Sequence, residues 1–232
     1  MLQLFDFLNF NFRVVGQYTN LFIDGVLSTL WLSLICLVLS IFFGIFVALM
    51  RMSSVSIIWR TAAAYIQVIR STPLLIQIYL IYYGLPALLP IGNFFDETST
   101  AIIALTIHTT PYMGEIIRAG ILSVDKGQEE GAKSVGLTPF QSMFYIILPQ
   151  AISNVIPPLI GQTAVLIKDT SLFSIIAVFE LMSAGINMYS ETIMATESYV
   201  TTGVCYLFIY ALTLILAYFV QNKLGGKAWQ TN

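Results

Sequence analysis

The stretch EGAKSVGLTPFQSMFYIILP, residues 130–149, decides how the rest of the chain is interpreted, because it is a long segment of mixed polarity in an otherwise apolar sequence. The residues around its start predict a short helix over Gly127–Val135. Gly136 is expected to end that helix, since glycine suits the left-handed conformation that follows a helix end.

A second helix is predicted directly after this glycine. Thr138 is expected to cap it, with Pro139 at the first helical position and Gln141 placed to complete a capping box. Pro149 is expected to end it. Its apolar residues recur at helical spacing, which predicts an amphipathic helix: Phe140, Met143, Phe144 and Ile147. Two short helices that meet at a glycine form a surface that a soluble partner can bind. We call this surface, residues 127–149, the knuckle.

Composition places this knuckle in a membrane protein. The chain is 57% hydrophobic and 9% charged, with a mean hydropathy of +0.84, whereas soluble domains are about one-quarter charged. The net charge of −2 argues against a nucleic-acid partner, which requires a basic face. Cys36 and Cys205 lie in apolar blocks without CxxC spacing and are interpreted as core residues. The single histidine makes a dedicated metal site improbable. We therefore expect an all-α polytopic membrane protein.

Hydropathy predicts about five spans in a transmembrane domain over 21–222. Residues 1–20 lack the pattern of a cleaved signal peptide and are expected to lie along the external membrane surface. The connection that holds the knuckle covers about 123–150, and a tail covers 223–232. The expected spans are about 22–50, 62–89 (interrupted by Pro73 and Pro86), 101–122, the residues from Pro157-Pro158 to about 181, and 200–220.

The basic residues predict the orientation of these spans. Among the basic residues outside the predicted spans, only Arg13 lies on the same side of the membrane as the N-terminus. The positive-inside rule therefore places the N-terminus outside, and the knuckle and C-terminus in the cytoplasm. The others fall on the second side: Arg51, Arg60, Arg118, Lys126, Lys133, Lys223 and Lys227.

The chain is not expected to hydrolyse ATP. Residues 127–134, GQEEGAKS, have the wrong spacing for a phosphate-binding loop, and no predicted strand precedes them. A powered process would therefore need a separate nucleotide-binding subunit.

The knuckle carries a family resemblance. Its pattern E-x-A-x3-G-x9-I-x-L-P resembles the coupling-loop (EAA) signature of bacterial ABC importer permeases, of the type I fold. Gly131 stands where alanine is usual, which softens the first helix by ~1 kcal/mol. The alternative is an ordinary cytosolic loop with two surface helices. The matching positions are Glu130, Ala132, Gly136, Ile146, Leu148 and Pro149.

Three further segments resemble permeases for polar amino acids of the histidine, glutamine, arginine and cystine class. They are residues 65–74 (YIQVIRSTPL), 111–121 (PYMGEIIRAGI) and 166–172 (LIKDTSL). Two departures, Gln67 where many relatives carry an acid and Pro111 where a small residue is commoner, put the specificity in doubt.

The resemblance implies a multi-subunit importer in the bacterial cytoplasmic membrane. It implies two permease subunits, either two copies of this chain or one copy and a paralogue. It also implies two ATPase subunits that bind ATP and Mg and dock on the knuckles, and an external solute-binding protein that delivers the amino acid. No cofactor is implied in this chain itself.

Polar residues inside the predicted spans are the candidates for a substrate pathway, because ionisable groups in a membrane are costly and usually face a cavity or one another. They form stripes on the second, third and fourth spans, which predict a hydrated cavity near mid-membrane. The candidates are Gln67, Arg70, Thr72, His108, Tyr112, Glu115, Gln162, Lys168 and Asp169; Gln77 continues the first stripe.

Each candidate has a simpler interpretation. Arg70 and Arg118 can snorkel to the membrane surface, and Lys168 can pair with Asp169 or with a second subunit. His108 can be an interhelical hydrogen-bonding residue. Glu115 either pairs with Arg118 or meets a substrate ammonium.

Other function classes remain open to test. An ion-coupled secondary transporter, an ABC permease for another small solute and a membrane scaffold are the alternatives. An intramembrane enzyme would need a nucleophile and base or a metal motif, and His108 has no such partners at a suitable spacing. The sequence leaves the identity of the amino acid open.

Overall fold

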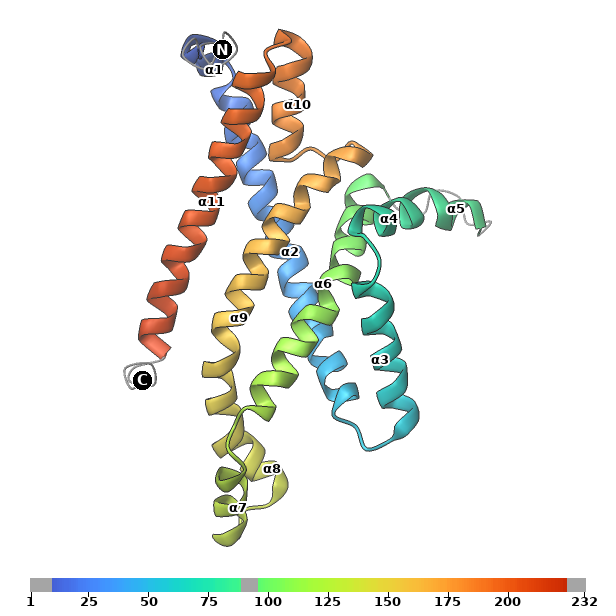
Figure 1. Cartoon of the computed structure of the whole chain (residues 1–232), viewed down its shortest axis with the longest axis vertical. Coiled ribbons are helices and arrows are strands. Elements are labelled where there is room, and N and C mark those ends of the chain that lie inside the picture. Colours follow the sequence, from blue (N-terminus) through green and yellow to red (C-terminus); the bar gives the residue numbers. More distant parts are fainter. Residues whose placement is uncertain (1–9, 89–95, 225–232) are drawn as a thin grey trace, which may run out of the picture. The chain divides into compact units, whose positions relative to one another are not determined.

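The computed structural model describes residues 10–88 and 96–224, and the regular elements of these residues are helical (Figure 1). The helices are α1 (Phe12–Gln17), α2 (Thr19–Arg51), α3 (Ser56–Arg70), α4 (Leu74–Tyr79), α5 (Leu85–Leu88), α6 (Glu97–Leu122), α7 (Lys126–Ser134), α8 (Pro139–Ser142), α9 (Leu148–Asp169), α10 (Leu181–Thr192) and α11 (Ala195–Leu224). Two π-helical turns (Leu80–Gly84 and Met143–Ile147) and a 3-10 helix (Thr170–Ile176) complete them. Residues 1–9 of the expected surface segment and 225–232 of the expected tail lie outside the described residues.

Three of the described helices are long and apolar enough to cross a membrane: Thr19–Arg51, Pro139–Ile176 and Ala195–Val220. A fourth span results if Ser56–Arg70 and Leu74–Leu88, a pair bent by 104°, are counted together. The segment expected to span over 101–122 does form a helix, α6. Its threonines, His108 and charged residues lower its mean hydropathy, so α6 is not among the helices apolar enough to count as a span.

Prolines act differently from the prediction at two places. Pro149 does not end the second helix of the knuckle. The following span begins before Pro157-Pro158, and both prolines lie inside α9. The reason lies in the π-helical turn before α9, where the Leu148 N–H donates to the Met143 carbonyl. This wider turn leads straight into α9, and Pro149, which has no N–H to donate, sits near the start of that helix.

The chain divides into two compact units, and α2, α6, α9 and α11 each contribute residues to both. Of the described residues, unit 1 comprises 10–36, 74–88, 96–105 and 165–212, and unit 2 comprises 37–73, 106–164 and 213–224.

Unit 1 is organised around α10. A buried cluster joins α10 to α2, α9 and α11 through Phe22, Ile167, Leu181, Ala184, Met188 and Ile209. Gly25 allows α2 to approach closely, because a Cβ at this position would lie 3.0 Å from the Cα of Leu181. The predicted spans leave the residues between about 181 and 200 as a connection, whereas in the structure Leu181–Thr192 fold as this packed helix.

Unit 2 is held together by close helix contacts at glycines. A Cβ on Gly44 would lie 2.8 Å from the Cβ of Met113, and one on Gly114 would lie 2.9 Å from a methyl group of Val47, so α2 and α6 nearly touch. A Cβ on Gly120 would overlap the side chain of Val155 on α9. Small residues permit such contacts between membrane helices, where packing replaces the hydrophobic effect as the driving force.

Pro111 illustrates how unit 2 satisfies a backbone group that a proline leaves unpaired. A proline in a helix cannot donate to the carbonyl four residues earlier, which here belongs to Ile107. The Tyr65 hydroxyl of α3 donates to that carbonyl at 2.8 Å. α6 therefore continues through Pro111 with the help of a side chain from another helix.

Substitution of Gly120 by alanine is expected to destabilise the protein by about 1–3 kcal/mol, because the added methyl group overpacks the contact with Val155. The measurement is the apparent Tm of the purified protein in detergent. Gly161→Ala is the matched control, since a Cβ at Gly161 meets nothing within 4 Å. The double variant Gly120→Ala/Val155→Ala should recover part of the loss, and equal Tm values for Gly120→Ala and Gly161→Ala would contradict this account of the contact.

Candidate functional site

The first helix of the predicted knuckle forms as α7. The Asp125 side chain caps it by accepting from the Gly127 N–H at 2.7 Å. Glu129 and Lys133 form an ion pair one turn apart at 2.6 Å, and this hydrogen bond and the lysine charge lower the pKa of Glu129. After the last turn, Gly136 adopts a φ of +82°, which confirms the predicted end of the helix.

The second helix of the knuckle starts with the predicted capping box. The Gln141 N–H donates to the Thr138 hydroxyl at 3.3 Å, and the Thr138 N–H donates to the Gln141 side-chain oxygen at 2.9 Å. Pro139 occupies the start of α8 as expected.

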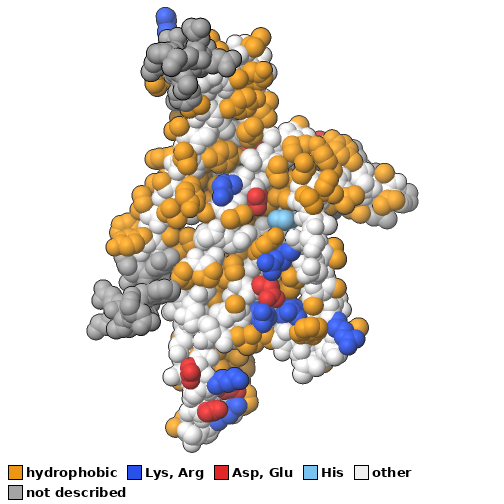
Figure 2. Space-filling view, viewed as in Figure 1, with side chains coloured by type: hydrophobic (Ala, Val, Ile, Leu, Met, Phe, Trp, Pro, Cys, Tyr) orange, Lys and Arg blue, Asp and Glu red, His pale blue; other side chains and the backbone are white. Residues whose placement is uncertain are grey.

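The knuckle presents both apolar and charged side chains to the exterior. Phe140 is 71% exposed and Phe144 50% exposed, and their rings lie 4.5 Å apart. Acidic and basic side chains gather over α7 (Figure 2). Large apolar side chains that lie exposed beside each other are typical of a surface that a partner covers.

The residues of the EAA signature occupy different positions on this knuckle. Glu130 and Gly131 are exposed on α7, while Ala132 is buried. Leu148 is partly buried and Pro149 exposed at the start of α9. Glu130 belongs to none of the ion pairs among the described residues, so its carboxylate faces outward.

Polar contacts fasten the knuckle to the two long helices that enter and leave it (Figure 1). The Gln150 amide donates to Gln128 at 3.2 Å, and the Asn154 amide donates to the Ser123 hydroxyl at 2.9 Å. The first bond joins α7 to α9, and the second, together with the Gly120–Val155 contact, joins the end of α6 to α9.

Glu115 is held between two arginines in unit 2. Its carboxylate accepts from Arg118 at 2.8 Å and from Arg51 at 3.2 Å. The Arg51 guanidinium also lies over the Trp59 ring, 4.6 Å from its centroid. Of the two interpretations of Glu115, the structure therefore shows the arginine pair. Sequence reasoning missed Arg51 as a partner, because the two residues are remote in the chain.

The polar stripes of α3 and α6 meet within unit 2. The Arg70 guanidinium lies 5.1 Å from the centroid of Tyr112, whose ring lies 5.6 Å from that of His108. Two further candidates make local hydrogen bonds: the Gln67 amide of α3 donates to the Ser71 hydroxyl at 3.2 Å, and the hydroxyl of Thr72, just after α3, donates to the Val68 carbonyl at 3.0 Å.

The third stripe is divided between the two units. Gln162 is partly buried in unit 2, whereas Lys168 and Asp169 lie in unit 1. Lys168 and Asp169 are not among the ion pairs of the described residues. The Lys168 ammonium lies 5.9 Å from the centroid of the Tyr210 ring and also interacts electrostatically with the Asp169 carboxylate.

Glu180 is a buried charged residue that the sequence reasoning did not select. Its carboxylate accepts from the N–H groups of Met182 and Ser183 at the start of α10, at 2.7 and 2.8 Å. It also accepts from the Tyr206 hydroxyl at 2.8 Å. The sequence does place an acid directly before the first residue of α10, where carboxylates cap free N–H groups, but no helix was predicted to start there.

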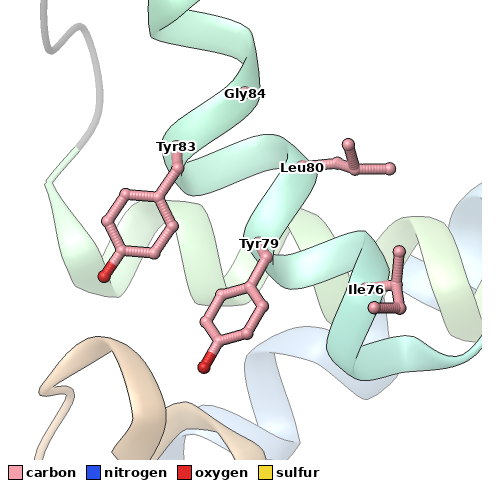
Figure 3. Close-up of a pocket in the computed structure, with 5 residues that line it drawn as sticks. All are labelled: Ile76, Tyr79, Leu80, Tyr83 and Gly84. Atoms are coloured by element: carbon pink, nitrogen blue, oxygen red, sulfur yellow. The ribbon is translucent and has the colours of Figure 1, made fainter.

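An open apolar groove of about 570 Å³ lies along α4 and the π-helical turn after it. Tyr79 and Tyr83 project to one side of this segment, and Ile76 and Leu80 project to another (Figure 3). None of the candidate pathway residues lines it. Its tyrosines and aliphatic side chains are the types that face the membrane interface.

Substitution of Glu115 by glutamine should destabilise the protein by about 1–3 kcal/mol, because it leaves two arginines without a counter-charge. The loss should be smaller than for a fully buried pair, since the three side chains are 18–27% exposed. The apparent Tm in detergent measures it. Glu129→Gln, which removes an exposed pair, should leave the Tm nearly unchanged, and an unchanged Tm for Glu115→Gln would contradict the role assigned to the pair.

Comparison with known proteins agrees with this geometry. Residues 40–226 match the family described as binding-protein-dependent transport system inner membrane component. The probable glutamine ABC transporter permease protein GlnM of Bacillus subtilis is 36% identical over 92% of this chain and 98% of its own length. The glutamine transport system permease protein GlnP of Escherichia coli is 32% identical over 93% of this chain and 96% of its own length.

Solved structures extend the comparison to the fold. An amino acid ABC transporter with histidines superposes with a TM-score of 0.86 and 36% identity, covering 92% of this chain and 98% of that one. The MetNI methionine ABC transporter shares the fold, with a TM-score of 0.74 at 19% identity over 89% of this chain and 97% of that one. The chain therefore belongs to the family of binding-protein-dependent transport system inner membrane components.

Proposed function

We propose that this chain is the permease subunit of an ATP-driven importer that carries polar amino acids into the cell across the cytoplasmic membrane. The observation that carries the proposal is the knuckle of α7 and α8, which is hydrogen-bonded to α9 and exposes Glu130, Phe140 and Phe144. Such a surface fits a soluble partner. The names of the relatives, which include glutamine permeases, support the substrate class.

The partner is an ATPase subunit that binds ATP and Mg, and this chain binds neither. Two permease subunits, identical or paralogous, surround the pathway, and an external solute-binding protein delivers the amino acid. The distribution of basic residues supports an external N-terminus and a cytoplasmic knuckle.

The contacts of the knuckle support a mechanism of alternating access. When the ATPase subunits close on ATP, they displace α7 and α8. This displacement is then transmitted to the ends of α6 and α9 that adjoin the knuckle. It passes through the hydrogen bonds of Gln150 and Asn154 and through the contact of Gly120 with Val155. Gly136 is the hinge between the two short helices. Glu130 supplies a polar contact with the ATPase.

Uptake into sealed vesicles tests the proposal. Vesicles that hold this chain, its ATPase and its binding protein are offered a panel of amino acids with and without ATP on the cytoplasmic side. We expect ATP-dependent uptake of one or a few polar amino acids. Uptake that ignores ATP and collapses with an ion gradient would assign the chain to the secondary transporters instead.

The neighbouring glutamates of α7 provide a matched pair for this assay. Glu130→Ala should reduce ATP-dependent uptake at least tenfold while the complex still assembles, because its outward carboxylate is lost. Glu129→Ala removes a carboxylate of the same helix that is already paired with Lys133 and should retain most of the uptake. Equal effects of the two substitutions would argue against a specific role of Glu130.

The exposed rings predict the strength of ATPase docking. Phe140→Ser and Phe144→Ser should each weaken the association of permease and ATPase at least fivefold, because each removes a large apolar contact. Co-purification at graded detergent and salt concentrations, or a titration of the purified subunits, measures the change. Retention of full affinity in both variants would show that the ATPase docks elsewhere.

A further inference from the structure

Near its middle, α6 is weakened as a helix. Residues 106–111, TIHTTP, place three threonines and a proline within one and a half turns, and both residue types disfavour the helical conformation. The Thr110 hydroxyl donates to the Thr106 carbonyl at 2.7 Å. A side-chain bond of this kind competes with the backbone bond to the same carbonyl and tends to bend a helix. Pro111 removes the next backbone bond altogether.

A side chain of α3 replaces the missing bond. The Tyr65 hydroxyl donates at 2.8 Å to the Ile107 carbonyl, which is the carbonyl that an N–H at position 111 would otherwise reach. Thr110 and Pro111 are buried, and a carbonyl left without a donor in such surroundings is costly. The continuity of α6 at this turn therefore depends on one hydroxyl group from a different helix.

The parts of α6 on either side of this turn are held by different contacts. Before the turn, the Ile102 carbonyl accepts from the Cys36 thiol at 3.9 Å, and both residues belong to unit 1. After the turn, the Glu115 carboxylate accepts from Arg51 at 3.2 Å, and both residues belong to unit 2. The helix passes from one compact unit to the other at residues 105–106, where the weakened segment begins.

The part of α6 that follows Pro111 leads into the knuckle. Its end is joined to α9 by the hydrogen bond of Asn154 with Ser123 and by the contact of Gly120 with Val155. A displacement of the knuckle therefore reaches this part of α6 directly. A regular helix resists bending, because its backbone bonds must yield. At Pro111 one backbone bond is already absent, and its replacement is a side-chain bond that a small rotation can break.

We propose that α6 bends at Pro111 when the ATPase displaces the knuckle, and that Tyr65 positions this hinge by holding the Ile107 carbonyl. The part of α6 before the hinge keeps its contacts in unit 1, and the part after it follows the knuckle. This inference rests on the proposed function and adds to it the place where α6 yields. Tyr65 is a positioning residue, since it acts through the turn at Pro111.

A double-mutant cycle in the purified protein in detergent tests whether Tyr65 acts through the proline. Tyr65→Phe should lower the apparent Tm by about 2–6 °C, because it leaves the Ile107 carbonyl without a donor. Pro111→Ala restores a backbone N–H for this carbonyl, so in that background Tyr65→Phe should lower the Tm by less than about 1 °C.

Tyr82→Phe is the matched control for this cycle. The Tyr82 hydroxyl donates to Glu97 at 3.2 Å, at the exposed start of the same helix, so its removal should change the Tm equally with and without Pro111→Ala. If Tyr65→Phe also lowers the Tm equally in both backgrounds, Tyr65 does not act through the proline and the proposal is overturned.

Transport kinetics distinguish a hinge from a merely structural bond. In vesicles that hold the complete importer, Pro111→Ala should lower the maximal rate of ATP-dependent uptake at least threefold, because it stiffens α6, and should leave the half-saturating substrate concentration within about twofold. The Tm of this variant should not fall. Pro86→Ala, which replaces a proline of α5, is the matched control and should keep the maximal rate. An unchanged rate for Pro111→Ala would overturn the proposal.

Amide hydrogen exchange reports the bending itself. In the reconstituted complex, a peptide that covers residues 106–115 should exchange at different rates without nucleotide and with ATP and vanadate, and Pro111→Ala should abolish this difference. Equal rates in the two states of the unmodified complex would overturn the hinge. Failure of the proposed function is distinct, since ATP-dependent uptake by the unmodified complex would then be absent from the start.

Discussion

A polar group that leaves water for a bilayer must find its partner inside the protein, and much of this structure follows from that constraint. Pro111 leaves the Ile107 carbonyl without a helical donor, and the Tyr65 hydroxyl supplies one. The carboxylate of Glu115 accepts from Arg51 and Arg118. These contacts join α3 to α6 and α2 to α6, so satisfying a polar group also fixes how helices of unit 2 pack.

Glycine contacts complete the packing that the polar contacts begin. Close approach at Gly44, Gly114 and Gly120 brings α2, α6 and α9 together in unit 2. In unit 1, Gly25 does the same for α2 and α10, and Glu180 caps α10 with a buried carboxylate. Each unit thus relies on dispersion between closely packed backbones and on a few hydrogen-bonded charges, since apolar burial does not drive association between helices in lipid.

The knuckle depends on this framework in one respect only. It is a local structure whose two short helices are set by their own caps and turn, and the framework serves to attach it to α6 and α9. In the proposed importer, the knuckle receives a displacement from the ATPase.

The sequence by itself determined the membrane class, the long first and last spans, and the knuckle with its capping box and the left-handed Gly136. These features depend on composition or on residues within a few positions of one another, where capping bonds and hydropathy act without help from the rest of the chain. Tertiary structure decided that Arg51 joins Glu115, that Arg70 stacks on Tyr112, and that α9 continues through Pro149, Pro157 and Pro158. It also decided that Glu180 starts a buried helix and that Lys168 lies beside Tyr210. The partners in these contacts are remote in sequence or lie on different helices, so their pairing depends on how the helices pack, which spacing along one chain does not reveal.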